Sequence, residues 1–224
     1  MQWLNWTGRT LVSLYREGQP GLSAAAQLAG ILQACDRDLA GAGLALENGV
    51  RHRVWTRSRA ARDASNDARA RLIAGQRRCA TSSFIDAGRF ISGADVALEL
   101  LAQVPAARAE RRLVDFAPPR RYAHYLVQDG LVFVSGMAES GDGLVQQFER
   151  ALAEVRRALD LESLQWTNVL SASLFIERGT ADAAWLMRRF ADALPGPLAD
   201  VTCEEVDGLA STDKHLEIEV TARR

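Results

Sequence analysis

The chain has 224 residues, of which 48% are hydrophobic and 25% are charged, and its formal net charge is −1. This composition is typical of a globular protein and excludes a disordered or fibrous chain, while the length fits one large domain or two small ones. No apolar run approaches the roughly 18 residues that span a bilayer, and the first residues do not form a secretory signal. The three cysteines are widely spaced and do not suggest a disulfide framework, so we expect a cytoplasmic protein.

The first half of the chain is predicted to alternate strands with two amphipathic helices. Its first helix carries an apolar stripe at helical spacing, which places Leu28, Ile31 and Cys35 on one face. A turn at Thr7-Gly8 joins the two strands that precede this helix. The predicted elements in chain order are strands 3–6 and 10–16, helix 22–42, strand 50–56, helix 59–74, and strands 79–86 and 94–102.

The second half repeats this order. Phe148, Ala151 and Val155 stand 120 positions after the residues of the first stripe, and Asp129-Gly130 is a typical hairpin turn. Each copy is predicted to place two helices on one face of a mostly antiparallel sheet, so the fold class is α+β and the second face of each sheet must be buried elsewhere. After a linker at about 103–118, the predicted elements are strands 122–127 and 131–135, helix 144–160, strand 169–176, helix 180–194 with Thr180 as its N-cap, and strands 199–206 and 214–222.

Two segments of the second half carry a resemblance to a known family. The run 129–136, Asp-Gly-Leu-Val-Phe-Val-Ser-Gly, and the closing strand 216–220, Leu-Glu-Ile-Glu-Val, are similar to the signature and the last strand of the RidA (YjgF) reactive-intermediate deaminases. The first half resembles the same fold more weakly, through residues 42–44, 50–56 and 96–100. The resemblance implies two tandem RidA-like (chorismate-mutase-like) domains, a divergent one over residues 1–104 and one closer to the family over residues 116–224.

The resemblance also implies a function and an assembly. We expect a deaminase-like hydrolase that acts on an imine, an enamine or a related small-molecule intermediate in an interdomain cleft, with no cofactor and no metal. Because family members commonly form trimers, we expect a homo-oligomer such as a trimer. The alternative is a non-catalytic metabolite-binding or structural RidA-like protein. A chorismatase-like enzyme is a further alternative, since such enzymes also resemble fused RidA-like domains, although they are longer.

Five candidate site residues follow from the resemblance. Glu217 matches a glutamate that positions the hydrolytic water, and Cys203 matches a reactive cysteine, so both are expected to be catalytic. Tyr122 matches a tyrosine at the cleft mouth, Gly136 a backbone contact to substrate, and Asn66 an asparagine on the second helix of the first copy. The structural alternatives are a solvent-facing carboxylate for Glu217 and a small buried side chain for Cys203.

The substrate-binding arginine of the family is absent from both copies. In the deaminases it binds a substrate carboxylate through a bidentate fork, and its position falls on Thr81 in the first copy and on Asp200 or Val201 in the second. Arg51 and Arg53 lie on one face of strand 50–56 and are candidate substrate-binding residues, because either could supply the missing guanidinium. The alternative is that both arginines pair with acidic residues of the second copy.

Other ligand classes have little support. His52, His124 and His215 lack the spacing of a metal site, and no glycine-rich phosphate loop occurs. Residues 1–112 carry 16 Arg against 10 acidic residues, whereas residues 113–224 carry 10 Arg and one Lys against 18 acidic residues. Two domains that face each other with complementary charge explain this division, and RNA binding by the basic half is the alternative. We expect no nucleic-acid partner.

Overall fold

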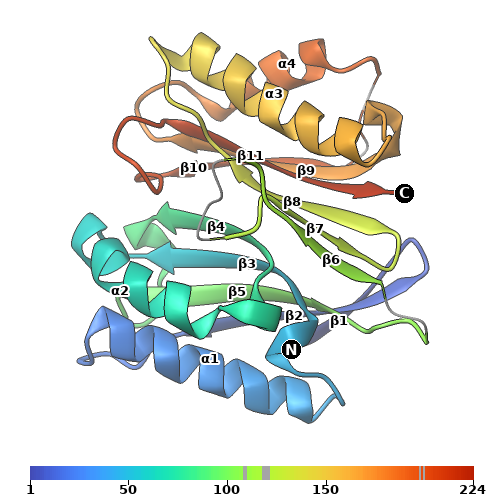
Figure 1. Ribbon diagram of the computed structural model, residues 1–224. Helices are drawn as coiled ribbons and strands as arrows, with labels where there is room; N and C mark the ends of the chain where they lie inside the picture. The colour runs from blue at the N-terminus through green and yellow to red at the C-terminus, as the bar shows by residue number, and fades with distance from the viewer. Residues whose placement is uncertain (108–109, 118–121, 197, 199) are drawn as a thin grey trace.

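The first half of the chain forms a five-stranded sheet with two helices on one face (Figure 1). The structure is a computed structural model that describes residues 1–107, 110–117, 122–196, 198 and 200–224. The elements of this half are β1 (Gln2–Trp6), β2 (Arg9–Glu17), α1 (Ala24–Ala40), β3 (Gly49–Thr56), α2 (Arg59–Leu72), β4 (Ala80–Ile85) and β5 (Val96–Gln103). The strand order is β1-β2-β5-β3-β4, in which β3 and β4 are parallel and the other neighbours are antiparallel.

The second half repeats this topology. Its strands lie in the order β7-β8-β11-β9-β10, with β9 and β10 parallel and the other neighbours antiparallel, and β6 adds a further strand beside β7. The two halves thus share one order and one pattern of strand directions, which confirms the predicted α+β repeat. The elements are β6 (Arg111–Val114), β7 (Tyr125–Gln128), β8 (Leu131–Met137), α3 (Leu144–Leu161), β9 (Val169–Glu177), α4 (Ala183–Ala193), β10 (Val201–Val206) and β11 (Leu216–Arg223).

Two local expectations differ from the structure. Strand β6 forms inside the segment predicted as a linker, because it pairs with β7 and extends the second sheet. Helix α4 begins later than predicted, since Asp182 rather than Thr180 is its N-cap and accepts a hydrogen bond from the backbone N–H of Trp185. The Thr180 hydroxyl instead donates to the backbone carbonyl of Glu177.

Both predicted hairpin turns use the left-handed backbone region. Thr7 and Gly8 have φ values of 49° and 76°, and Asp129 and Gly130 have φ values of 47° and 83°. Two successive residues with positive φ are typical of the tight turn whose twist matches antiparallel strands. The same turn therefore opens each half at the equivalent hairpin.

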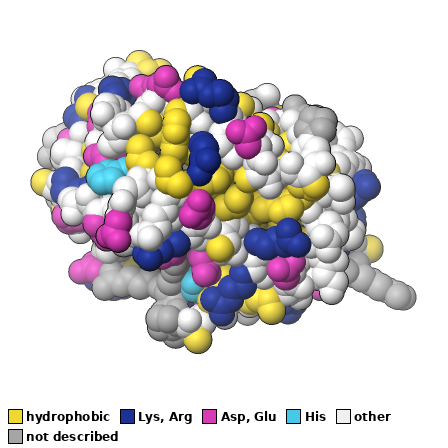
Figure 2. All heavy atoms as spheres, turned by 90° about the horizontal axis from the view of Figure 1, so that it is seen from above, with side chains coloured by type: hydrophobic (Ala, Val, Ile, Leu, Met, Phe, Trp, Pro, Cys, Tyr) yellow, Lys and Arg dark blue, Asp and Glu magenta, His cyan; other side chains and the backbone are white. Residues whose placement is uncertain are grey.

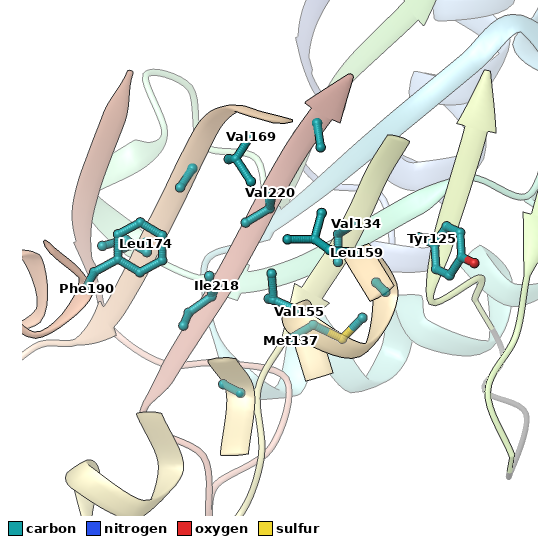
Figure 3. Close-up of a cluster of buried hydrophobic side chains, with 14 of the residues drawn as sticks. Tyr125, Val134, Met137, Val155, Leu159, Val169, Leu174, Phe190, Ile218 and Val220 are labelled. Carbon is teal, nitrogen blue, oxygen red and sulfur yellow. The ribbon is translucent and has the colours of Figure 1, made fainter. Parts of the chain in front are cut away.

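The core of the second half lies between its sheet and its helices. Alternate residues of β11 point to this side, where Ile218 and Val220 belong to the core that α3 covers over β11 and α4 covers over β9 and β10. Figure 3 shows Val155 and Leu159 near Val134, with Phe190 beside Leu174. The remaining residues of β11 must point to the opposite face, and Glu217, Glu219 and Thr221 are nevertheless buried.

Helix α2 differs from the other helices in what it buries. Its buried positions hold Ala61, Ser65, Ala68 and the arginine Arg69. Because small side chains let a helix approach its neighbours closely, α2 packs tightly against α1 and the sheet. Arg69 is therefore buried, with 4% of the residue exposed to solvent.

The two sheets face each other between the helices, so each half buries the second sheet face of the other (Figure 1). Arg51 and Arg53 of β3 reach across this layer to the carboxylate of Glu219. This agrees with the interpretation of halves of complementary charge. Apolar contacts between the halves gather in two clusters, one including Leu11, Val50, Ala80, Leu126 and Phe133 and the other including Trp55, Phe84, Phe175 and Val206.

The outer surface over α3 and α4 is mixed in character. Figure 2 shows hydrophobic side chains among charged ones on this face, and Val145 and Leu161 of α3 are about half exposed. None of the helices in the described part of the chain has the length and apolar character to cross a membrane.

Candidate functional site

A cavity of about 420 Å³ opens between the two halves. The first half contributes one face of α2 and the strand β4, and the second half contributes the ends of β8 and β11 and the loop between β10 and β11. Its lining residues are mostly polar: Arg62, Asn66, Arg69, Thr81, Ser82, Ser83, Tyr122, Ala123, Ser135, Gly136, Ala138, Ala210, Ser211, Lys214 and Glu217.

Glu217 is the one carboxyl group among these lining residues. It is 4% exposed, and burial, with a further contribution from the nearby Glu219, raises its pKa to about 8. Its Oε1 atom is buried, and the Ser82 hydroxyl is the neighbour that partly counteracts the rise in pKa by hydrogen bonding to this carboxyl group. The side chain nevertheless lines the cavity, so the carboxyl group lies at its wall.

Gly136 permits the approach of Glu217. A Cβ atom at this position would lie 1.8 Å from Oε1 of Glu217 and 2.5 Å from Oγ of Ser82. The Ser82 hydroxyl is buried there too, and its hydrogen bonding lowers the pKa of the neighbouring carboxyl groups of Glu217 and Glu219. The absence of a side chain at Gly136 therefore leaves room for the Glu217 carboxyl group beside Ser82.

The wall opposite Glu217 carries a buried guanidinium. Arg69 Nε donates to the hydroxyl of Tyr122 at 2.6 Å, and its terminal nitrogens donate to the Ser82 carbonyl at 3.3 Å and to Asn66 Oδ1 at 3.5 Å. Burial lowers the pKa of Arg69, while Tyr122 and Glu217 partly counteract this shift. A guanidinium has five N–H groups, so these bonds leave two N–H groups that the described residues do not use.

Ser135 joins the two halves at the cavity floor. Its hydroxyl accepts a hydrogen bond from the backbone N–H of Thr81 at 3.0 Å and donates to the carbonyl of Ala123 at 2.6 Å. Strand β4 of the first half is thereby fixed against β8 of the second.

Four of the predicted site residues meet in this cavity. Tyr122, Gly136 and Glu217 come from the second half, and Asn66 comes from α2 of the first. The site is thus built across the two halves.

Cys203 does not lie in this cavity. It packs against the helix side of the second sheet, beside its β9 neighbour Leu174, whereas Glu217 faces the other half. The two residues expected to be catalytic therefore lie on opposite faces of the second sheet. Burial, with the nearby Glu205 and Glu204, raises the pKa of the Cys203 thiol to about 11, so that it is a neutral thiol at neutral pH.

Arg51 and Arg53 line a separate cavity of about 290 Å³ between the halves. Arg51 donates to the hydroxyl of Thr221 and to two backbone carbonyls, and Arg53 forms a bidentate contact with Glu219. The strand periodicity correctly placed both arginines on one face, and here that face meets acidic residues of the other half. Neither side chain reaches the cavity that contains Glu217.

Arg69 is the main site residue that sequence reasoning missed. It lies one helical turn after Asn66 and two turns after Arg62, so the three side chains share one face of α2. That spacing was a usable signal, because a polar stripe next to small residues is unusual for a buried helix. The resemblance directed attention to the strand position instead, which is Thr81.

The described residues contain no group of three or more histidine, cysteine or acidic side chains that could hold a metal ion. No protein-family model matches the chain, and no curated protein matches it.

Solved structures give a clear comparison. A YjgF-family protein from Mycobacterium tuberculosis is 22% identical and aligns with 51% of this chain and 100% of its own, with a TM-score of 0.46. A YjgF-family protein from Neisseria meningitidis is 26% identical and aligns with 51% of this chain and 95% of its own, with a TM-score of 0.45. A chorismatase structure is 16% identical, aligns with 99% of this chain and 79% of its own, and has a TM-score of 0.68.

The chorismatase structure follows both halves of the chain, so it shows the fold of the chain as a whole. Together with the repeated strand order, it confirms a tandem of two α+β halves, with the cavity at Glu217 between them.

Proposed function

We propose that the chain is an enzyme that hydrolyses the imine of a small carboxylic acid in the cavity at Glu217. The observation that carries this proposal is the buried carboxyl group of Glu217, which lies beside Gly136 and lines one cavity together with Arg69. A carboxyl group with a pKa near neutrality is suited to both giving and taking a proton.

Arg69 anchors the substrate carboxylate. Its two unused N–H groups fit a carboxylate, and its bonds to Tyr122 and Ser82 hold the guanidinium in one orientation. The side chain comes from a helix, whereas the arginine of the deaminases comes from a strand. Arg69 thus takes the task that Thr81 cannot perform.

Glu217 moves the protons of the reaction. Because its pKa is about 8, the carboxyl group is mostly protonated at pH 7 and donates a proton to the imine nitrogen. A water molecule in the cavity then adds to the carbon and gives one proton to the Glu217 carboxylate, which leaves a carbinolamine. The carboxyl group passes this proton to the amino group and takes the hydroxyl proton as the C–N bond breaks. One imine and one water thus give one ketone and one ammonia, and Glu217 ends protonated as it began.

The test uses imines generated in situ by an amino-acid oxidase, with imine decay compared with and without the protein. We expect acceleration over spontaneous hydrolysis, and a loss of about 100-fold or more in kcat for Glu217→Gln. Glu205→Gln is the matched control, because Glu205 is an exposed glutamate on β10 outside the cavity. Equal rates with the wild-type chain and with Glu217→Gln would contradict the proposal.

Two other functions have distinct outcomes in the same assay. Tight binding of a keto acid with no acceleration of imine decay would identify a metabolite-binding protein without catalysis. A chorismatase-like activity is the second candidate, because the chorismatase structure aligns with 99% of the chain. Consumption of chorismate that depends on Glu217 would identify this activity.

A further inference from the structure

The cavity at Glu217 has an excess of positive charge. Arg62, Arg69 and Lys214 line it, against the single carboxyl group of Glu217 among the described lining residues. Because Glu217 is mostly protonated at neutral pH, the lining side chains carry a net charge close to +3. A ligand with one carboxylate would leave most of this charge without a counterion.

The cations lie at separate depths. Arg69 is buried beside Tyr122 and Ser82, at the end of the cavity that holds Glu217. Arg62 lies seven residues earlier on the same helix, which at 1.5 Å per residue is about 10 Å along the axis. The two guanidinium groups are therefore placed to bind two separate groups of a ligand rather than the same one.

Arg62 is available for a ligand. Its side chain lines the cavity and is 19% exposed. Its ion pair is with the adjacent Asp63, whose side chain is 58% exposed. Such exposed pairs contribute little stability, so a ligand anion can replace this contact at small cost.

Lys214 adds to the positive potential from the opposite side. It donates to the backbone carbonyl of Ala138 at 2.6 Å and lies 4.0 Å from Glu139. Glu139 partly balances its charge, so Lys214 supports the potential of the cavity rather than forming a second anchor.

The size of the cavity agrees with a ligand larger than the smallest imino acids. A volume of about 420 Å³ corresponds to about 14 water molecules at roughly 30 Å³ each. An imino acid with three or four carbon atoms occupies a minor part of this space. Both Glu217 and Arg62 line the cavity, so a longer ligand has room to contact both.

We infer that the ligand of this cavity carries two anionic groups, one bound by Arg69 beside Glu217 and one bound by Arg62. The substrate class is then the imine of a dicarboxylic amino acid. The reaction rests on the proposed function, whereas the recognition of two anionic groups does not.

The test is isothermal titration of the intact chain with keto acids, which lack the reactive imine. The probes are 2-oxoglutarate and oxaloacetate as dicarboxylates and 2-oxobutyrate as the matched monocarboxylate, at pH 7 and low salt. We expect the dicarboxylates to bind about tenfold or more tightly than the monocarboxylate. Arg62→Met is expected to remove this advantage, with a much smaller loss of affinity for 2-oxobutyrate than for the dicarboxylates, whereas Arg69→Met weakens both to a similar degree.

Arg71→Met is the control, because Arg71 is an exposed arginine of the same helix outside the cavity. Equal affinity for monocarboxylates and dicarboxylates, or an advantage that survives Arg62→Met, would overturn the inference. Such a result leaves the proposed hydrolase intact if imine decay still depends on Glu217. A dicarboxylate preference that depends on Arg62, without any imine hydrolysis, would instead support the inference and contradict the proposed reaction.

Discussion

At the scale of single residues, the absence of a side chain at Gly136 is what lets the carboxyl group of Glu217 occupy its position. A Cβ atom there would overlap Oε1 of Glu217 and press on the Ser82 hydroxyl. Both neighbours are buried in the tight layer between the halves, so neither can move away without disturbing other contacts.

We therefore expect Gly136→Ala to displace Glu217 and to abolish its action in the cavity. Overpacking of this kind costs about 1–3 kcal/mol of stability. Urea denaturation measures that cost, and the imine-decay assay measures the loss of rate. Gly196→Ala is the matched control, because a Cβ atom there meets no neighbour within 4 Å. Wild-type activity in Gly136→Ala would show that the position of Glu217 is not constrained in this way.

Glu217 also predicts how stability depends on pH. Its folded-state pKa is raised from 4.5 to about 8, so between these values the folded chain holds a proton that the unfolded chain has lost. The stabilisation from this proton is complete below about pH 4.5 and is lost as the pH rises through 8. Glu217→Gln removes the titration.

We expect the unfolding free energy of Glu217→Gln relative to wild type to rise by on the order of 3 kcal/mol between pH 5 and pH 9. Urea denaturation of both proteins at the two pH values measures this difference. A constant difference across that range would show that Glu217 does not have the raised pKa.

The residue scale also shows what sequence can and cannot predict. Glu217, Tyr122, Gly136 and Asn66 were located by resemblance, because each occupies a recognisable place in its segment. The side of the sheet that Cys203 faces could not be predicted in this way. Strand β10 has a mixed burial pattern without a clear alternation between buried and exposed residues. The polar stripe of α2 was a local signal for Arg69, but the contact of Arg69 with Tyr122 of the other half leaves no mark in local sequence.

At the scale of elements, β11 is the strand on which the two halves depend. Its acidic residues alternate with apolar ones, a pattern that normally indicates one solvent-facing side. The other half covers that side, so Glu219 is fully buried and is held ionised by Arg53 and Arg51, which keep its pKa low against the cost of burial. Local periodicity predicted the strand and its two faces, but only the packing of the halves determines what each face contacts.

Glu219→Gln is expected to destabilise the chain by about 3–5 kcal/mol, because it leaves two buried arginines without their carboxylate. Chemical denaturation at pH 7 measures the effect. Glu99→Gln provides the comparison, since Glu99 contacts Arg53 and Arg89 at 3.6 Å with 28% of its side chain exposed, and its loss should cost clearly less. Equal costs for the two variants would contradict the assignment of Glu219 as the central partner.

At the scale of the whole molecule, the two halves share one buried layer. The ring of Phe84 in β4 stacks on that of Phe175 in β9, with ring centroids 4.0 Å apart, and Trp55 packs beside both. The sequence predicted that each sheet needs cover on its second face, and here the other half of the same chain provides it. The trimer and the domain limits 1–104 and 116–224 stay predictions.

Because the layer is shared, we expect the chain to unfold in one cooperative transition. Calorimetry should give a van't Hoff enthalpy equal to the calorimetric enthalpy. Residues 1–104 or 116–224 expressed alone should expose the aromatic layer and aggregate or remain partly unfolded. Two separate transitions, or a folded and soluble single half, would show that the halves are independent.

The single polypeptide that joins the two walls of the cavity has a consequence for dilution. When the walls of a site belong to separate molecules, the fraction of complete sites falls as the protein is diluted below the dissociation constant of its assembly. Here α2 and β11 belong to one polypeptide, so the effective concentration of one wall at the other is fixed by the chain that joins them. The ligand affinity per chain should therefore be the same at nanomolar and micromolar protein, whatever the state of association of whole chains.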